Sequence, residues 1–145
     1  MSGTLATIGY ERDTLDGVIA RLKAAGVTRL IDVRAVASSR RPGFSKTMLA
    51  ASLEAAGIGY VHLRALGTPK AGREAARAGR VVEMQAIFRD HMDAPEAIAA
   101  LAQATDLAAA QPSALLCFEA EARCCHRAIV AQAIRGALRC EVVDL

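Results

Sequence analysis

Short apolar runs alternate with stretches of helical periodicity along nearly the whole chain. The runs of strand length are residues 4–10, 29–33, 59–63, 114–118 and 140–145. Between them, apolar residues recur at intervals of three and four positions, which is the spacing of a helix that buries one face. This alternation is typical of a parallel sheet whose two faces are both covered by helices.

The pattern predicts one α/β domain over residues 1–145, with a single-domain three-layer Rossmann-like fold and a mainly parallel sheet of about five strands. The chain length suits one domain, and no repeat, low-complexity segment or linker interrupts the alternation. The order of the strands within the sheet does not follow from the pattern.

Cap and turn residues predict where the helices begin. Asp13, Ser45 and Asp93 are expected as N-caps, because their short polar side chains accept hydrogen bonds from the first N–H groups of a helix. The helix after Ser45 is expected to bury a stripe that includes Met48. The last helix is expected to start near residues 123–124.

The composition is 53% apolar and 23% charged, which is ordinary for a compact globular protein. No apolar run approaches about 20 residues, the length of a transmembrane helix. The N-terminus lacks the basic start and long apolar segment of a secretion signal. We therefore expect a cytoplasmic protein without a membrane partner, in which the four cysteines are thiols rather than disulfides.

The net charge of +3 conceals a strongly basic middle segment. Residues 34–80 contain nine basic and two acidic residues, so this segment carries +7 while the remainder is acidic. Such an imbalance favours an anionic partner, although a solvated face rich in arginine has the same composition. Within it, residues 64–80 are expected to open as a loop and to end as a helix.

Polar residues follow the expected strands at their carboxyl ends, where ligands bind in open parallel sheets. These residues are Tyr10, Glu11, Arg12, Arg34, His62, Arg64, Cys117 and Glu119. Loops at this edge are polar in any α/β protein, so the cluster supports a site without identifying its chemistry. Asp32 lies inside an apolar strand on the same face as Arg34, and both a structural ion pair and a catalytic role remain open for it.

The stretch CFEAEARCCHR, residues 117–127, concentrates the chemistry of the chain. If the last helix begins near residue 123, Cys125, His126 and Arg127 lie in its first turn, where free N–H groups attract anions and lower the pKa of a thiol. Cys125 is then the candidate reactive thiolate, and Glu119 is a candidate general base or a partner of Arg127. Alternatively, the cysteines are buried packing residues at the junction of helix and sheet.

Two sharper interpretations of this stretch fail. Cys117 and Arg123 have the spacing of a cysteine phosphatase loop, but the intervening loop carries two glutamates and no glycine. The four potential metal ligands are Cys117, Cys124, Cys125 and His126. Three of them are consecutive and do not easily face one tetrahedral centre, so we predict no structural metal site. A looser transition-metal site that uses His62 or His126 is left open.

The segments TIGYE, IDVRAVASSRRPGFS, LEAAGIGYVHLRALG and LLCFEAEARCCHRAIVAQAI together resemble the domain of unknown function 488 family. The positions that match the family pattern are Gly9, Asp32, Arg34, Ser39, Arg40, Gly43, Phe44, Tyr60, His62, Leu66, Gly67, Cys117, Glu119, Cys125, His126 and Arg127. The chain departs from the pattern at Ala37, at Thr68 and at residues 122–123. The resemblance implies an α/β fold with one polar site and implies no particular activity.

The leading functional hypothesis is an enzyme that acts on an anionic substrate, such as a nucleotide, a nucleic acid or a phosphorylated metabolite. Its expected catalytic residues are Cys125, His126 and Glu119, and its expected substrate-binding residues are Tyr10, Arg34, Arg40, Arg41, His62 and Arg127. The alternative is a non-catalytic module for nucleic acid or nucleotide, with Phe44 and Tyr10 as stacking groups. A third possibility is a partner-binding scaffold. The sequence predicts neither which cofactor, if any, the protein uses nor its oligomeric state.

Overall fold

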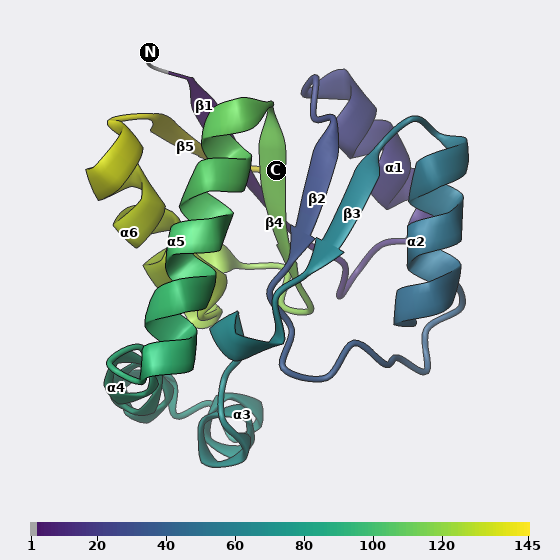
Figure 1. Cartoon of the computed structure of the whole chain (residues 1–145). Helices are drawn as coiled ribbons and strands as arrows, with labels where there is room; N and C mark the ends of the chain where they lie inside the picture. The colour runs from purple at the N-terminus through teal and green to yellow at the C-terminus, as the bar shows by residue number, and fades with distance from the viewer. Residues whose placement is uncertain (1–2) are drawn as a thin grey trace.

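A computed structural model describes residues 3–145 and contains a five-stranded sheet flanked by helices (Figure 1). The strands are β1 (Thr4–Gly9), β2 (Arg29–Asp32), β3 (Gly59–His62), β4 (Ser113–Cys117) and β5 (Glu141–Asp144). All neighbouring strands are parallel, and their order is β3-β2-β4-β1-β5. The predicted Rossmann-like α/β class is confirmed, and each of the five apolar runs contains a strand.

The helices form two layers and an end cap. They are α1 (Leu15–Ala24), α2 (Lys46–Ala55), α3 (Lys70–Arg77), α4 (Val81–His91), α5 (Pro95–Ala110) and α6 (Arg127–Leu138). Helices α1 and α2 cover one face of the sheet, α5 and α6 cover the other, and α3 and α4 lie beyond the carboxyl ends of the strands (Figure 1). Among the described residues, no helix combines the length and the apolar character that crossing a membrane requires.

Successive residues of a strand pack into two separate hydrophobic cores, because their side chains point to opposite faces of the sheet. In β4, Ala114 and Leu116 pack with α1 and α2, whereas Leu115 and Cys117 pack with α5 and α6. Because both faces of the central strands are buried, their sequences are continuous apolar runs without alternation. This leaves the carboxyl end of the sheet as the place where polar groups gather.

Two of the expected N-caps are wrong by one residue. The N-cap of α1 is Thr14, whose hydroxyl accepts the N–H of Gly17 at 3.1 Å. Asp13 instead accepts the N–H of Thr14 and pairs with Arg21 at 2.8 Å. The N-cap of α5 is residue 94 because Pro95 takes the first helical position, as its fixed φ favours.

Helix α2 begins after Ser45 as predicted, but its buried stripe is narrower than expected. Met48 is 61% exposed, and Leu49 and Leu53 supply the buried contacts. The hydroxyl of Ser45 does not cap the helix; it accepts the N–H of Ser39 at 3.1 Å and thereby fixes the loop that follows β2.

Helix α6 begins later than predicted. Residues 122–124 form a 3₁₀ turn, Cys125 is extended with φ −125° and ψ 145°, and the first helical residue is Arg127. Cys125 therefore precedes the helix instead of lying in its first turn. Cys125 and His126 lie with their side chains close together, whereas Cys124 belongs to the 3₁₀ turn, which matters for the site described below.

The carboxyl end of β1 meets the chain leaving β4 at very close range. A Cβ atom on Gly9 would lie 1.7 Å from the carbonyl oxygen of Glu119, so this approach requires glycine. The family-pattern position Gly67 is similar, since its Cβ would lie 2.2 Å from the backbone nitrogen of Ala35. The first contact joins the end of β1 to the loop after β4, and the second joins the loop after β2 to the segment after β3.

We expect Gly9→Ala to reduce the free energy of unfolding by at least about 3 kcal/mol, because the added methyl group meets backbone atoms that cannot rotate away. The matched control is Gly136→Ala in α6, where an added Cβ meets nothing within 4 Å. That control should raise stability by about 0.5–1 kcal/mol through helix propensity. Urea unfolding of both variants checks the pair, and equal effects would contradict the packing described for β1.

Candidate functional site

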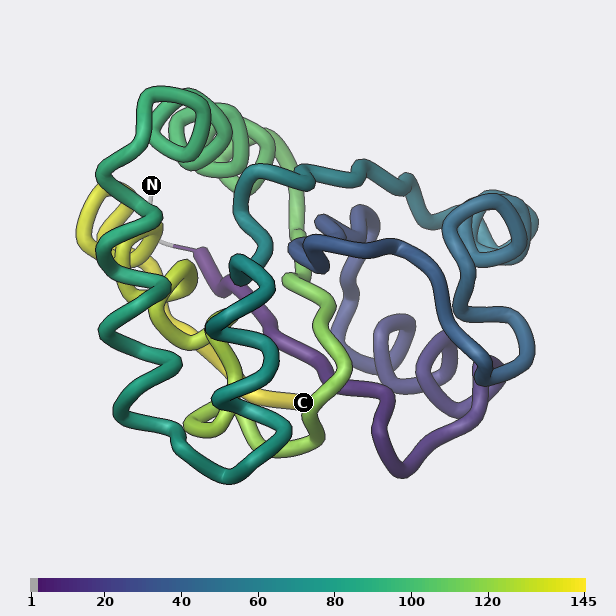
Figure 2. Tube along the Cα trace, turned by 90° about the horizontal axis from the view of Figure 1, so that it is seen from below, coloured from purple at the N-terminus to yellow at the C-terminus, as the bar shows by residue number. Residues whose placement is uncertain are grey.

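A cavity of about 480 Å³ opens at the carboxyl ends of β1, β2 and β4. The loop after β2, helix α3 and the loop after β4 form its walls. Figure 2 shows the backbone of these segments from the side of the strand ends. The lining residues are Tyr10, Arg34, Ala35, Val36, Ser38, Ser39, Arg40, Thr68, Arg73, Ala76, Arg77, Met84, Cys117, Phe118, Glu119, Cys124 and His126. The cavity lies where the sequence analysis expected a ligand.

The floor of the cavity rests on a buried ion pair between Asp32 and Arg34. The guanidinium donates to Oδ1 at 2.9 Å and to Oδ2 at 2.7 Å, and its remaining nitrogen donates to Tyr10 Oη and to the carbonyl oxygen of Phe44. Tyr60 donates to Asp32 Oδ2 at 2.6 Å. Each nitrogen of the Arg34 side chain therefore donates at least one hydrogen bond within the protein.

This network shifts two pKa values. Burial disfavours the charged guanidinium, yet the hydrogen bonds and charge of Asp32 outweigh it and raise the pKa of Arg34. Burial and the hydrogen bond to the Asp32 carboxylate both raise the pKa of Tyr60. Of the two roles left open for Asp32, the geometry supports the structural pair.

The aromatic residues expected to stack on bases are not available for stacking. The rings of Tyr10 and Phe44 lie parallel to one another at 4.3 Å, and both residues are buried. Phe118 packs edge-on against Tyr10, is 41% exposed and lines the cavity. An aromatic contact with a ligand would therefore come from Phe118, which the sequence analysis did not select.

Two of the predicted anion-binding arginines hold loops together instead. Arg127 is 0% exposed and donates to the carbonyl oxygens of Glu119 and Ala120, at 2.5 Å and 3.3 Å. Arg41 donates to the carbonyl oxygens of Asp13 and Glu11. Neither lines the cavity. We therefore expect their roles to be structural.

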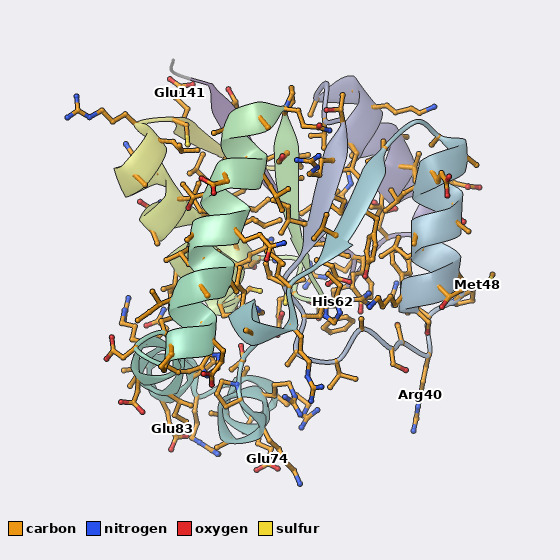
Figure 3. The ribbon with its side chains drawn as sticks, in the orientation of Figure 1. Arg40, Met48, His62, Glu74, Glu83 and Glu141 are labelled. Atoms are coloured by element: carbon orange, nitrogen blue, oxygen red, sulfur yellow. The ribbon has the colours of Figure 1, made fainter. Side chains whose placement is uncertain are left out.

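Three other arginines line the cavity. Arg40 extends outward from the loop after β2 at the edge of the cavity (Figure 3), and no side-chain bond engages it among residues 3–145. Arg73 and Arg77 come from one face of α3, where Arg73 donates to the carbonyl oxygen of Thr68 at 2.9 Å. Only Glu119 adds a carboxylate to the lining. The basic middle of the sequence thus contributes Arg73 and Arg77 to the cavity wall and Arg40 to its edge.

The inner end of the cavity carries a cluster of Cys117, Glu119, Cys125 and His126. The Cys117 sulfur lies 3.3 Å from Glu119 Oε2 and 3.6 Å from His126 Nδ1. The Cys125 sulfur lies 3.7 Å from the same Nδ1. On the other side of the ring, His126 Nε2 donates to the carbonyl oxygen of Val33 at 2.7 Å, so Nδ1 is the nitrogen that faces both sulfurs.

Burial and mutual contact perturb the pKa values of the whole cluster. The hydrogen bond with Cys125 and burial raise the pKa of Cys117, and burial raises the pKa of Glu119. Burial alone would raise the pKa of Cys125, but Cys117, His126 and Arg127 together lower it well below its usual value. Burial would lower the pKa of His126, and the negative charge of Cys125 raises it.

The cluster differs in two ways from the predicted catalytic set of Cys125, His126 and Glu119. Cys125 is buried behind the cavity wall, whereas Cys117, which was not in the predicted catalytic set, is buried and also lines the cavity. His62, predicted to bind substrate, donates from Nε2 to the carbonyl oxygen of Arg34 at 2.7 Å and lies outside the lining (Figure 3).

The sequence analysis did not predict the residues that line the cavity on the side of helix α3. Arg73, Arg77 and Thr68 lie in residues 64–80, for which the apolar pattern predicted only a loop followed by a helix. The spacing of four residues between Arg73 and Arg77 was the available signal, because it places both on one helix face. Nothing in the pattern indicated which surface that face would meet.

Comparison with models of protein families gives one match. The model described as Domain of unknown function DUF488 covers residues 14–134, which is most of the chain. Comparison with curated proteins and with solved structures found no match.

We expect Asp32→Ala to reduce the free energy of unfolding by about 3–5 kcal/mol, since it leaves the Arg34 charge buried without its partner. Glu83→Ala is the matched control, because the Arg80–Glu83 pair is exposed and worth at most about 1 kcal/mol. Chemical denaturation measures both. A small effect at Asp32 would show that the pair does not hold the cavity floor.

Proposed function

Because the chain belongs to the family described as domain of unknown function DUF488, we propose its function from the geometry of the cavity. The protein is an enzyme that acts on a small anionic substrate, and a nucleotide fits the lining best. The observation that carries this proposal is one cavity lined both by three arginines besides the paired Arg34 and by a thiol, an imidazole and a carboxylate.

The arginines favour an anion. Arg73 and Arg77 from α3 belong to the lining, and Arg40 extends outward at its edge, whereas the charge of Arg34 is matched by Asp32. Guanidinium groups bind phosphate through paired N–H donors, and they do so most strongly where solvent is limited. Ser38 and Ser39 add hydroxyl groups to the same wall.

A nucleotide is favoured over a simple phosphate because the cavity also has an apolar side. Phe118 offers an exposed aromatic surface, supported from behind by Tyr10. Met84, Val36 and Ala76 extend this apolar wall. A volume of about 480 Å³ lies within the range of small-molecule sites, which combine mostly apolar walls with a few polar anchors.

The cluster favours an enzyme over a binding module. A sulfur in contact with both a carboxylate and an imidazole nitrogen is an arrangement that nucleophilic and acid–base chemistry uses. A ligand held by the arginines would lie against Cys117 and Glu119. We therefore assign the reaction to this cluster, which contains the predicted Cys125, His126 and Glu119 and adds Cys117.

The non-catalytic nucleic-acid module remains as a second candidate because of exposed charge outside the cavity. Arg64, Lys70, Arg80 and Lys46 are exposed basic residues. Against it, the rings of Tyr10 and Phe44 are buried against one another and cannot stack on bases. The cavity at the strand ends therefore favours a small ligand.

The test is calorimetric titration of the protein with inorganic phosphate and with nucleoside mono- and diphosphates. We expect a nucleotide to bind more tightly than phosphate. Arg77→Gln should weaken nucleotide binding roughly 10–100-fold through the loss of about 1.5–3 kcal/mol of charged hydrogen bonding. Arg89→Gln on the neighbouring helix α4 is the control and should bind as the wild type does, since Arg89 is exposed and outside the cavity.

Absence of binding, or equal effects of the two arginine variants, would contradict the proposed ligand. If a nucleotide binds, mass spectrometry of the incubated mixture should show product with the wild type and none with Cys117→Ala. If the wild type binds a nucleotide and forms no product, the proposal of an enzyme is contradicted and the non-catalytic module is favoured.

The salt dependence of oligonucleotide binding separates the two candidates. A module that contacts four phosphates of a single strand should give a log–log slope of about −3. We expect an oligonucleotide to bind no more tightly than a mononucleotide, because the cavity accepts one unit. Tight oligonucleotide binding with the steep slope, measured by fluorescence anisotropy, would favour the module.

A further inference from the structure

Three groups that proteins use as zinc ligands converge at the inner end of the cavity. The ligand atoms of Cys117, Cys125 and His126 all lie within 4.8 Å of one another, and all three residues are buried. We propose that these side chains bind one transition-metal ion of the zinc class, and that the fourth coordination position opens into the cavity. The binding itself is independent of the proposed function.

The spacing of the three atoms suits a tetrahedral ion. Bonds of about 2.3 Å to sulfur and about 2.0–2.1 Å to nitrogen at a tetrahedral angle separate the sulfur and nitrogen atoms by about 3.6 Å. The distances from His126 Nδ1 to the Cys117 and Cys125 sulfurs are 3.6 Å and 3.7 Å. Both separations between sulfur and nitrogen therefore match a tetrahedral ion, and the two sulfurs, which lie within 4.8 Å of one another, would need to be about 3.8 Å apart.

Hydrogen bonds account for only one of the two contacts between a sulfur and His126 Nδ1, since the Cys117 thiol can donate to Glu119 Oε2 instead. His126 Nδ1 has one lone pair, because Nε2 carries the proton that is donated to the Val33 carbonyl oxygen. Two thiols face that one lone pair, and only one of them can donate to it. A metal ion, by contrast, would engage both sulfurs and the nitrogen together.

The surroundings resemble the outer shell of a metal site. A metal-bound histidine commonly donates its second N–H to a backbone carbonyl, which fixes the ring. The bond from Nε2 to Val33 has this geometry, at 2.7 Å. The Cys125 sulfur also accepts the backbone N–H of Arg127 at 3.5 Å, which stabilises negative charge on a sulfur ligand.

The local backbone explains how consecutive residues reach one centre, which the sequence analysis had taken as an argument against a metal. Cys125 is extended and His126 is helical, so both side chains turn inward. Cys124 belongs to the preceding 3₁₀ turn, lines the cavity and lies outside the group of three.

An open fourth position gives the site a chemical role. Cys117 and His126 line the cavity, and Glu119 Oε2 lies 3.3 Å from the Cys117 sulfur. Three protein ligands and one free position are typical of catalytic zinc, which lowers the pKa of bound water or polarises a substrate oxygen. This role rests on the proposed function: the ion would face the bound anion, with Glu119 beside it as proton acceptor.

The experiment is titration of the reduced full-length protein with Co²⁺, which replaces zinc and absorbs visibly in four-coordinate thiolate sites. We expect one ion per chain, a thiolate-to-cobalt charge-transfer band, and displacement by Zn²⁺. Cys125→Ser should weaken binding more than about 100-fold, beyond the effect of losing an outer-shell partner. Cys140→Ser, at a buried cysteine outside the group, should leave binding unchanged.

Absence of the charge-transfer band in the folded wild type would overturn the proposal, as would equal binding by Cys125→Ser. If the Cys125→Ser variant does not fold, a measurement on the wild type alone still tests the proposal. X-ray absorption of the zinc-loaded wild type should show two sulfur ligands at about 2.3 Å, and a shell of only nitrogen and oxygen would overturn the site.

The two proposals fail separately. If the protein binds cobalt and no nucleotide, the proposed substrate is contradicted and the proposed metal site is supported. If metal-free protein binds and converts a nucleotide, the proposal of an enzyme is supported and the proposed catalytic role of the ion is contradicted.

Discussion

The buried ion pair between Asp32 and Arg34 is the interaction on which the rest of the site depends. It joins the ends of three strands, because Tyr10 follows β1, Asp32 ends β2 and Tyr60 belongs to β3. It also holds the loop after β2 through the carbonyl oxygen of Phe44. Two charges removed from water are costly to bury unless they are paired and hydrogen-bonded, and here each guanidinium nitrogen and both carboxylate oxygens have partners. The cavity floor is therefore rigid before any ligand arrives.

Two histidines extend this rigidity along the chain that leaves β2. His126 donates to the carbonyl oxygen of Val33, and His62 donates to the next carbonyl, that of Arg34. One imidazole comes from the start of α6 and the other from β3, so consecutive peptide groups are held by different elements. The same bond that fixes the backbone also orients His126 Nδ1 towards the two sulfurs. Scaffold and reactive cluster are thus one hydrogen-bonded unit, which is how a precise site is maintained.

The sequence predicted the elements better than their arrangement. Apolar runs located all five strands because burial on both faces leaves a strong pattern, and the rule for parallel sheets placed the site at their ends. The predicted start of α6 was wrong, because Cys125 is extended and its side chain belongs to the buried cluster. That arrangement comes from tertiary contacts, which the local sequence pattern does not show. Arg127 carries a charge and still lies fully inside, bound to carbonyls of a loop that the pattern cannot position. Arg73 and Arg77 could not be assigned to the cavity because the strand order and the docking of α3 arise from tertiary contacts.

Chemical-shift mapping on isotope-labelled protein, with adenosine monophosphate as the probe, tests the central claim most directly. The claim is that one cavity joins an arginine-lined binding wall to the cluster of Cys117, Glu119, Cys125 and His126. The account predicts saturable shifts confined to the amides of the loop after β2, of α3 and of residues 117–126. Shifts spread over the exposed basic surface, or no shifts at millimolar probe, would contradict it.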